Sequence, residues 1–224
     1  MRRIIGGTFV SLDGVMQAPG GPTEDTTGGF DLGGWVFKYS DEQFGEAIGK
    51  LFDREYDLLL GRRTYDIFAA YWPYYEGGED NPIATAFNAC NKYVLTSGDQ
   101  DLPWANSHRL KTVADVAALK VTSGPDLIIQ GSSTLYPALL DAGLIDRLTL
   151  MTFPVTLGTG KRLFGKGTPA RKLTMVEQSV TSGGIICSTY EPAEPIVDAG
   201  SASPPPTTND REQERQRKMK EGNW

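Results

Sequence analysis

The hydrophobic residues of this chain fall into short continuous runs separated by amphipathic stretches. The three leucines at 58–60, followed by Gly61, are typical of a strand buried on both faces, as in a parallel sheet. Similar patterns predict strands at 3–11, 92–98, 107–110, 126–130 and 144–155. The segments 171–180 and 184–190, joined at Ser182-Gly183, predict a closing antiparallel pair.

Helical spacing occurs between these strands. From Phe44 to Phe52 the apolar residues recur at intervals of three and four, which predicts a helix running to about Arg54. Ser40 and Gln43 match a capping box at its start. Further helices are predicted after Gly61 and at 83–89, 113–120 and 135–140. Because strands alternate with helices and the chain ends in a hairpin, the pattern predicts an α/β fold with a mainly parallel sheet.

The composition changes at Glu191. The residues that follow include five prolines among glycine, serine and threonine, and residues 210–221 are almost wholly charged or polar. Such a segment has no apolar face to bury, so any helix in it is expected to be marginal. The sequence therefore predicts one folded domain over residues 1–191 and a disordered tail over 192–224.

Charge and residue counts exclude several function classes. The net charge of −6 argues against nucleic acid as a partner, although an anionic cofactor needs only a local positive pocket. No stretch approaches the ~20 apolar residues of a membrane span, and Gly6 and Gly7 interrupt the one segment that resembles a signal peptide. Two cysteines and a single histidine, His108, predict no metal site and no disulfide framework. These features fit a protein of the cytoplasm.

Two strand-to-helix turns are candidate anion sites. The first turn comprises Gly61, Arg62, Arg63 and Thr64, and the second comprises Gly131, Ser132, Ser133 and Thr134. Unpaired N–H groups and a partial positive charge at a helix N-terminus attract phosphate, and arginine adds charge-assisted hydrogen bonds. The alternative is an ordinary turn with two solvated arginines. The second turn is not GxGxxG, so a Rossmann fingerprint is absent.

A long loop precedes a group of aromatic residues. Residues 17–34 are rich in glycine, proline and threonine, and loops of this length in compact domains are usually functional or disordered. Trp35, Phe37 and Tyr39 follow it. They are expected to form the wall of a site for a flat ring or to join the core, and we assign at least two of the three to the core.

Five motifs occur in one order along the chain. They are Ser11-Leu12-Asp13-Gly14, 58–65 (Leu-Leu-Leu-Gly-Arg-Arg-Thr-Tyr), Tyr71-Trp72-Pro73, 130–135 (Gln-Gly-Ser-Ser-Thr-Leu) and 154–160 (Pro-Val-Thr-Leu-Gly-Thr-Gly). Together they resemble the dihydrofolate-reductase-like proteins related to the C-terminal reductase domain of bifunctional riboflavin biosynthesis proteins, over roughly residues 3–190. The resemblance implies a central, mostly parallel sheet of about eight strands flanked by helices, and a homodimer.

The resemblance also implies NADPH lying across the carboxyl ends of the strands. Gly61, Arg62, Arg63 and Thr64 are then expected at the diphosphate and the adenosine 2′-phosphate. Thr96 and Ser97 match the strand-end turn near the adenosine ribose. Gly131, Ser132, Ser133 and Thr134 match the turn beneath the diphosphate, where dihydrofolate reductases usually carry two consecutive glycines.

Two acids are candidates for the proton source of such a reductase. Asp13 follows the first strand, so it is expected at the carboxyl edge of the sheet. Asp41 shares the inward face of its helix with Phe44, and the acid of dihydrofolate reductases lies on the first helix. Burial beside a ring such as Trp35 is expected to raise either pKa. The alternatives are that Asp13 caps the turn before Gly14 and that Asp41 complements the helix dipole.

The resemblance therefore implies a bacterial NADPH-dependent oxidoreductase acting on a small molecule. The substrate is expected to be a pterin- or pyrimidine-like heterocycle or a ribosylamine, such as 5-amino-6-(5-phosphoribosylamino)uracil or dihydrofolate. The chain carries no zinc-deaminase signature, which weakens a dedicated role in riboflavin biosynthesis. The alternative from another class is a non-catalytic nucleotide-binding protein or regulatory dimer.

Overall fold

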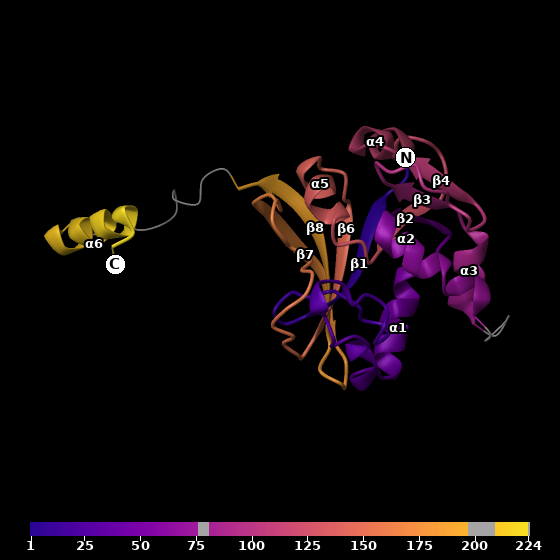
Figure 1. Ribbon diagram of the computed structural model, residues 1–224, viewed down its shortest axis with the longest axis horizontal. Coiled ribbons are helices and arrows are strands. Elements are labelled where there is room, and N and C mark those ends of the chain that lie inside the picture. Colours follow the sequence, from indigo (N-terminus) through magenta and orange to yellow (C-terminus); the bar gives the residue numbers. More distant parts are fainter. Residues whose placement is uncertain (76–80, 197–208, 224) are drawn as a thin grey trace. The chain divides into compact units, whose positions relative to one another are not determined.

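The computed structural model describes residues 1–75, 81–196 and 209–223, and it separates into two compact units, Met1–Glu194 and Pro195–Trp224. The first unit is built on one eight-stranded sheet with the order β4-β3-β2-β5-β1-β6-β8-β7 (Figure 1). The strands are β1 (Ile4–Ser11), β2 (Tyr56–Gly61), β3 (Lys92–Leu95), β4 (Ser107–Leu110), β5 (Asp126–Gln130), β6 (Arg147–Phe153), β7 (Arg171–Val180) and β8 (Ile186–Pro195).

The six strands from β4 to β6 pair in parallel, and β6 pairs antiparallel with β8. The predicted α/β class, the mostly parallel sheet and the antiparallel C-terminal hairpin are confirmed. The run of leucines in β2 reflects its central place: Leu58 and Leu60 join the core on one face of the sheet, and Leu59 joins the core on the other. A strand covered on both faces needs apolar side chains at every position.

Helices cover both faces of this sheet (Figure 1). On one face, α4 and α5 contribute to the same hydrophobic cluster as Ile4, Leu59 and Leu127. On the other face, α1, α2 and α3 contribute to two clusters that include Leu58, Ile128 and Phe153. The helices are α1 (Glu42–Leu51), α2 (Arg62–Ala69), α3 (Pro82–Ala89), α4 (Val113–Lys120) and α5 (Leu135–Asp141), with short 3-10 turns η1 (Thr27–Gly29), η2 (Trp35–Lys38) and η3 (Trp72–Tyr74).

The start of α1 differs from the prediction. Its N-cap is Asp41, whose carboxylate accepts the backbone N–H of Phe44 at 2.7 Å. The hydroxyl of Ser40 instead donates to the carbonyl of Val36, and Gln43 accepts the backbone N–H of Ser182. The predicted capping box was wrong because η2 and the β7–β8 turn bind the two side chains that it required.

The structure describes two parts of the segment 192–224, for which disorder was predicted. Strand β8 continues to Pro195, and α6 (Asp210–Glu221) forms a helix in the second unit. Asn209 caps the start of α6, Gly222 adopts φ +70 at its end, and pairs such as Glu214 with Arg217 lie along its surface. No residue of α6 is buried, as its composition predicted. Residues 197–208 lie outside the described residues.

Candidate active site

A cleft of about 820 Å³ lies at the carboxyl ends of β2 and β5, whose last residues, Gly61 and Gln130, line it. The remaining walls come from β1, the loop after β1, η2, α1, α2, η3, α3, the turn after β5 and Lys161. In a parallel sheet, ligands bind at the carboxyl ends of the strands. The cleft is therefore the candidate ligand site of the first unit.

The two predicted anion-binding turns meet at the base of this cleft. The backbone N–H of Gly61 donates to the hydroxyl of Ser132 at 2.9 Å, and the backbone N–H of Ser132 donates to the hydroxyl of Thr64 at 3.0 Å. Gly131 has φ +73, and a Cβ there would lie 3.2 Å from Thr64 Cγ2. Glycine is needed at position 131, whereas Ser132 holds φ +59 through these two hydrogen bonds. Gly61, Thr64 and residues 131–134 all line the cleft.

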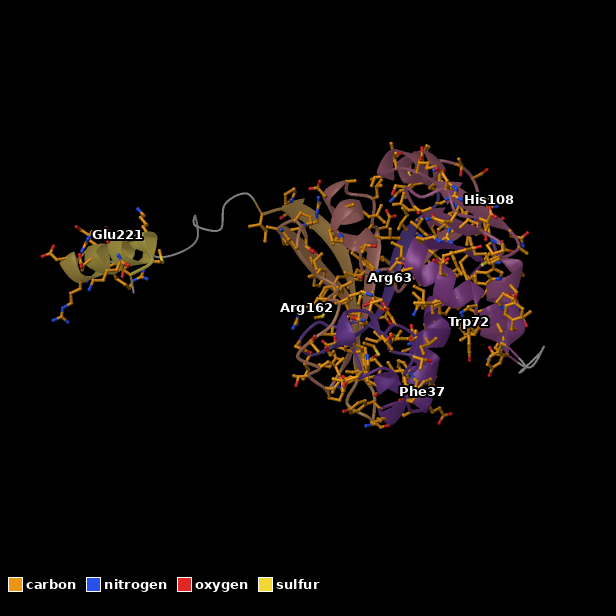
Figure 2. All side chains as sticks on the ribbon, viewed as in Figure 1. Phe37, Arg63, Trp72, His108, Arg162 and Glu221 are labelled. Carbon is orange, nitrogen blue, oxygen red and sulfur yellow. The ribbon has the colours of Figure 1, made fainter. Side chains whose placement is uncertain are left out.

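The two neighbouring arginines of α2, Arg62 and Arg63, have different environments. Arg63 lines the cleft, and in the described part of the chain its guanidinium has no hydrogen bond or ion pair. Figure 2 shows it near the middle of the first unit, with Trp72 among the helices beside it. Arg62 does not line the cleft; it pairs with Asp66 at 2.9 Å and donates to the carbonyl of Gln100 at 3.0 Å. Of these two arginines, Arg63 is the one whose guanidinium has no partner among the described residues and can bind an anion in the cleft.

Thr96 and Ser97 follow β3 and lie outside the cleft lining. The hydroxyl of Thr96 accepts the N–H of Gly98 at 3.2 Å, which closes the turn after β3. Arg62 donates to the backbone of the same loop at Gln100. These predicted cofactor residues thus belong to a separate group beside the start of α2.

Asp13 serves as a structural anchor and does not line the cleft. Its carboxylate accepts the hydroxyl of Ser11 at 2.6 Å and the N–H groups of Leu157 and Gly158 at 3.1 and 2.8 Å. The hydrogen bond from Ser11, reinforced by these backbone donors, lowers the pKa of Asp13 to about 2. The expectation of a raised pKa was wrong, since the turn after β1 binds the 154–160 segment through this carboxylate.

Asp41 also lies outside the cleft lining, and its carboxylate is hydrogen-bonded to other parts of the fold. Besides capping α1, its carboxylate accepts the hydroxyl of Ser182 at 2.8 Å and the N–H of Gly183 at 2.7 Å. The N–H of Phe44, and then the Ser182 and Gly183 donors, lower the pKa of Asp41 to about 2. The inward orientation predicted from helical spacing was wrong, because the first turn of α1 faces the β7–β8 turn.

The wall of the cleft is largely aromatic and aliphatic. The rings of Phe52, Phe68 and Trp72 pack around Phe87, with centroid separations of 5.5, 5.8 and 5.1 Å. Phe37, 67% exposed, also borders the cleft. Trp35 and Tyr39 belong to the core, as expected. The helical spacing predicted Phe52 only as part of the apolar side of its helix.

The loop after β1 brings charged residues to the cleft. Glu24 and Asp25 line it, and Asp25 forms an ion pair with Lys161. Buried Gln17 fixes the loop, because its side-chain oxygen accepts the N–H of Lys161 at 3.0 Å and its side-chain amide donates to the carbonyl of Asp25. The length of the predicted loop at 17–34 was the signal for this role, but no individual residue in it stood out.

Other features of the described residues lie outside the cleft. His108 is exposed, stacks on Tyr93 and lies away from Arg63 (Figure 2). Within residues 1–75, 81–196 and 209–223, no three His, Cys, Asp or Glu side chains group as metal ligands. None of the helices in those ranges is long and apolar enough to cross a membrane.

The fold and the cleft define a dihydrofolate-reductase-like α/β protein. A dihydrofolate reductase of Enterococcus faecalis, in complex with NADP(H) and RAB-propyl, shares the fold with a TM-score of 0.53 and 16% identity, over 86% of this chain and 97% of that one. A riboflavin biosynthesis protein from Shewanella sp. PV-4 matches with a TM-score of 0.57 and 20% identity, over 87% and 100% of the chains. The expected fold family is confirmed.

The family itself follows from the sequence match. The model of the RibD C-terminal domain matches residues 2–187, so the chain belongs to the RibD C-terminal domain family. Protein YyaP of Bacillus subtilis (strain 168) is 25% identical over 194 residues, which cover 84% of this chain and 94% of YyaP. The resemblance inferred from the five motifs is confirmed, and the family supports a reductase-type oxidoreductase acting on a small molecule.

Proposed function

We propose that the protein is an NADPH-dependent reductase of a pyrimidine- or pterin-like heterocycle or a ribosylamine. The observation that carries this proposal is the composition of the cleft, in which the free cation Arg63 and the Gly61 and Gly131 turns adjoin an aromatic wall. Arg63 and the two turns suit an anionic cofactor, and the aromatic wall suits a flat ring. Membership of the RibD C-terminal domain family supports the same assignment.

The residues at the base of the cleft fit a dinucleotide. Gly61, the N-cap of α2, provides no side chain to cap the first turn of that helix, which suits an anion at this end. Gly131 allows Thr64 to pack closely against the second turn, and the buried side-chain oxygen of Gln130 has no hydrogen-bond partner in the described part of the chain. NADPH bound here would supply the hydride for reduction. Arg63, Thr64 and residues 131–134 would hold its phosphates.

The aromatic part of the cleft would orient the substrate ring. Helix α1 and its C-cap contribute Ile48 and Phe52 to the wall, and Asp41 on the same element lies outside it. A carboxylate on the first helix is the feature expected of a true dihydrofolate reductase. We therefore favour a pyrimidine-like ring or a ribosylamine over dihydrofolate.

A substrate panel tests this function. The purified protein would be mixed with NADPH and with pterin, pyrimidine and ribosylamine compounds in turn, and loss of the reduced-nicotinamide absorbance would be followed. The proposal expects oxidation of NADPH that depends on at least one of these compounds. Saturable NADPH binding without oxidation would favour the non-catalytic nucleotide-binding alternative.

We also propose that the protein is a homodimer that pairs through β7. This strand ends the sheet, and its exposed side chains include Met175, Val176 and Val180, which are 52%, 46% and 57% exposed. An edge strand with exposed apolar side chains is prone to pair with another chain. Sedimentation analysis should give twice the chain mass of 24.4 kDa, and Val176→Lys should shift the protein towards monomer.

A further inference from the structure

Three of the five charged side chains in the described lining of the cleft are paired. Asp25 forms an ion pair with Lys161, and Asp66 pairs with Arg62 at the cleft margin. Arg63 is the free cation assigned above to the cofactor. Glu24 is thus the only carboxyl in the described cleft lining without a cationic partner.

Glu24 is held in position by the backbone of its own loop. Its Oε2 accepts the N–H of Gly20 at 2.6 Å, and its backbone N–H donates to the carbonyl of Gly21 at 3.3 Å. The side chain is partly buried. Burial, with a smaller contribution from the neighbouring Asp25 carboxylate, raises the pKa of Glu24, opposite to the shifts at Asp13 and Asp41.

The loop that carries Glu24 is anchored on both sides. The N–H of Gly34 donates to the carbonyl of Ala18 at 2.8 Å, and the ring N–H of buried Trp35 donates to the carbonyl of Gln17 at 2.9 Å. On the other side, Lys161 binds Asp25 and the hydroxyl of Thr27. These contacts hold the loop in place beside the cleft. The position of Glu24 in the cleft lining is therefore fixed by the anchored loop.

We propose that Glu24 is the acid that protonates the substrate during reduction. This assignment rests on the proposed function, in which hydride from reduced nicotinamide adds to the carbon of a C=N or C=O bond. The O–H bond of the Glu24 carboxyl then breaks as an N–H or O–H bond forms on the substrate. The carboxylate that remains regains its proton from water, so the enzyme returns to its starting state.

A competing role is that Glu24 only closes its loop through the bond to Gly20. Glu24→Gln separates the two roles, because a glutamine oxygen still accepts that N–H but the side chain carries no acidic proton. Glu46→Gln is the matched control, since Glu46 is an exposed acid on α1 away from the cleft lining. If Glu24 only closes its loop, Glu24→Gln and Glu46→Gln should have the same turnover.

The first measurement is a ¹³C NMR titration of glutamate carboxyls in the ligand-free protein, with Glu24→Gln identifying the Glu24 signal. Its midpoint should lie above the ~4.3 of an unperturbed glutamate, and a midpoint at or below that value would overturn the assignment. The second is turnover on a substrate reduced by the wild type. Glu24→Gln should lose about 10²-fold in kcat while NADPH affinity stays within about twofold, and Glu46→Gln should match the wild type.

The pH profile provides a further readout. Because the acid must be protonated, wild-type kcat should fall as pH rises through the Glu24 pKa, and this limb should disappear in Glu24→Gln. Full turnover of Glu24→Gln would overturn the Glu24 assignment and leave the reductase proposal standing. A wild type that oxidises NADPH with none of the compounds in the panel would instead remove the proposed function, and the role of Glu24 with it.

Discussion

The backbone N–H of Ser132 donates to the hydroxyl of Thr64 at 3.0 Å, which joins two strand-to-helix turns that are 68 residues apart in sequence. The hydroxyl of Ser132 accepts the N–H of Gly61 in return. These reciprocal bonds make one rigid base from the ends of β2 and β5. The segments expected to hold a diphosphate therefore depend on each other for their shape.

This relationship predicts that Thr64→Val weakens the fold. Valine keeps the shape of threonine but leaves the N–H of Ser132 without an acceptor, which should cost about 1–3 kcal/mol. Urea unfolding measures the loss. Thr64→Ser keeps the hydroxyl and is the control, so equal stability of the valine and serine variants would contradict the role of this bond.

Asp41 should contribute to stability and leave turnover unchanged. Its folded pKa, about 2, lies below the ~3.9 of an unfolded aspartate, so its contribution is present above about pH 4 and is lost as pH falls towards 2. Asp41→Asn should lower the melting temperature near neutral pH, and the difference from the wild type should vanish near pH 2. Full melting curves across this range, with Glu46→Gln as control, measure it. A loss of kcat in Asp41→Asn would restore the catalytic role expected from the sequence.

The extent of β8 gives a prediction about the C-terminal segment. Removing residues 197–224 should leave the melting temperature of the first unit unchanged, because the sheet ends at Pro195. Removing residues 192–224 should lower it, since Arg171 donates to the carbonyl of Ala193 at 2.7 Å and Lys172 pairs with Glu194. Calorimetry on the two truncated chains compares them directly. Equal melting temperatures would show that the end of β8 adds no stability.

Local patterns were enough to predict the fold. The continuous run of leucines in β2 and the 3.6-residue spacing from Phe44 to Phe52 depend only on neighbours in sequence. The position of the cleft followed from the ends of β2 and β5. The capping residue of α1 was missed because Gln43 binds Ser182, a residue 139 positions away.

The direction of individual polar side chains was not predictable in the same way. Asp13 is held by Leu157 and Asp41 by Ser182, contacts between segments about 140 residues apart that no local spacing reveals. Arg62 and Arg63 are adjacent, yet the side chains of successive helical residues point about 100° apart. Arg62 therefore forms an ion pair with Asp66, whereas Arg63 lines the cleft. Glu24 carries no motif, and its place in the cleft depends on how its whole loop is anchored.

The central claim is that Arg63 and the joined turns bind NADPH, and a fluorescence titration tests it most directly. The wild type should bind NADPH saturably and more tightly than NADH. Arg63→Ala should weaken NADPH binding by about 10- to 100-fold, because one charge-assisted contact is lost. Arg62→Ala should weaken NADPH binding less, because the Arg62 guanidinium is already paired with Asp66. Absence of saturable NADPH binding to the wild type, or unchanged affinity in Arg63→Ala, would contradict the account.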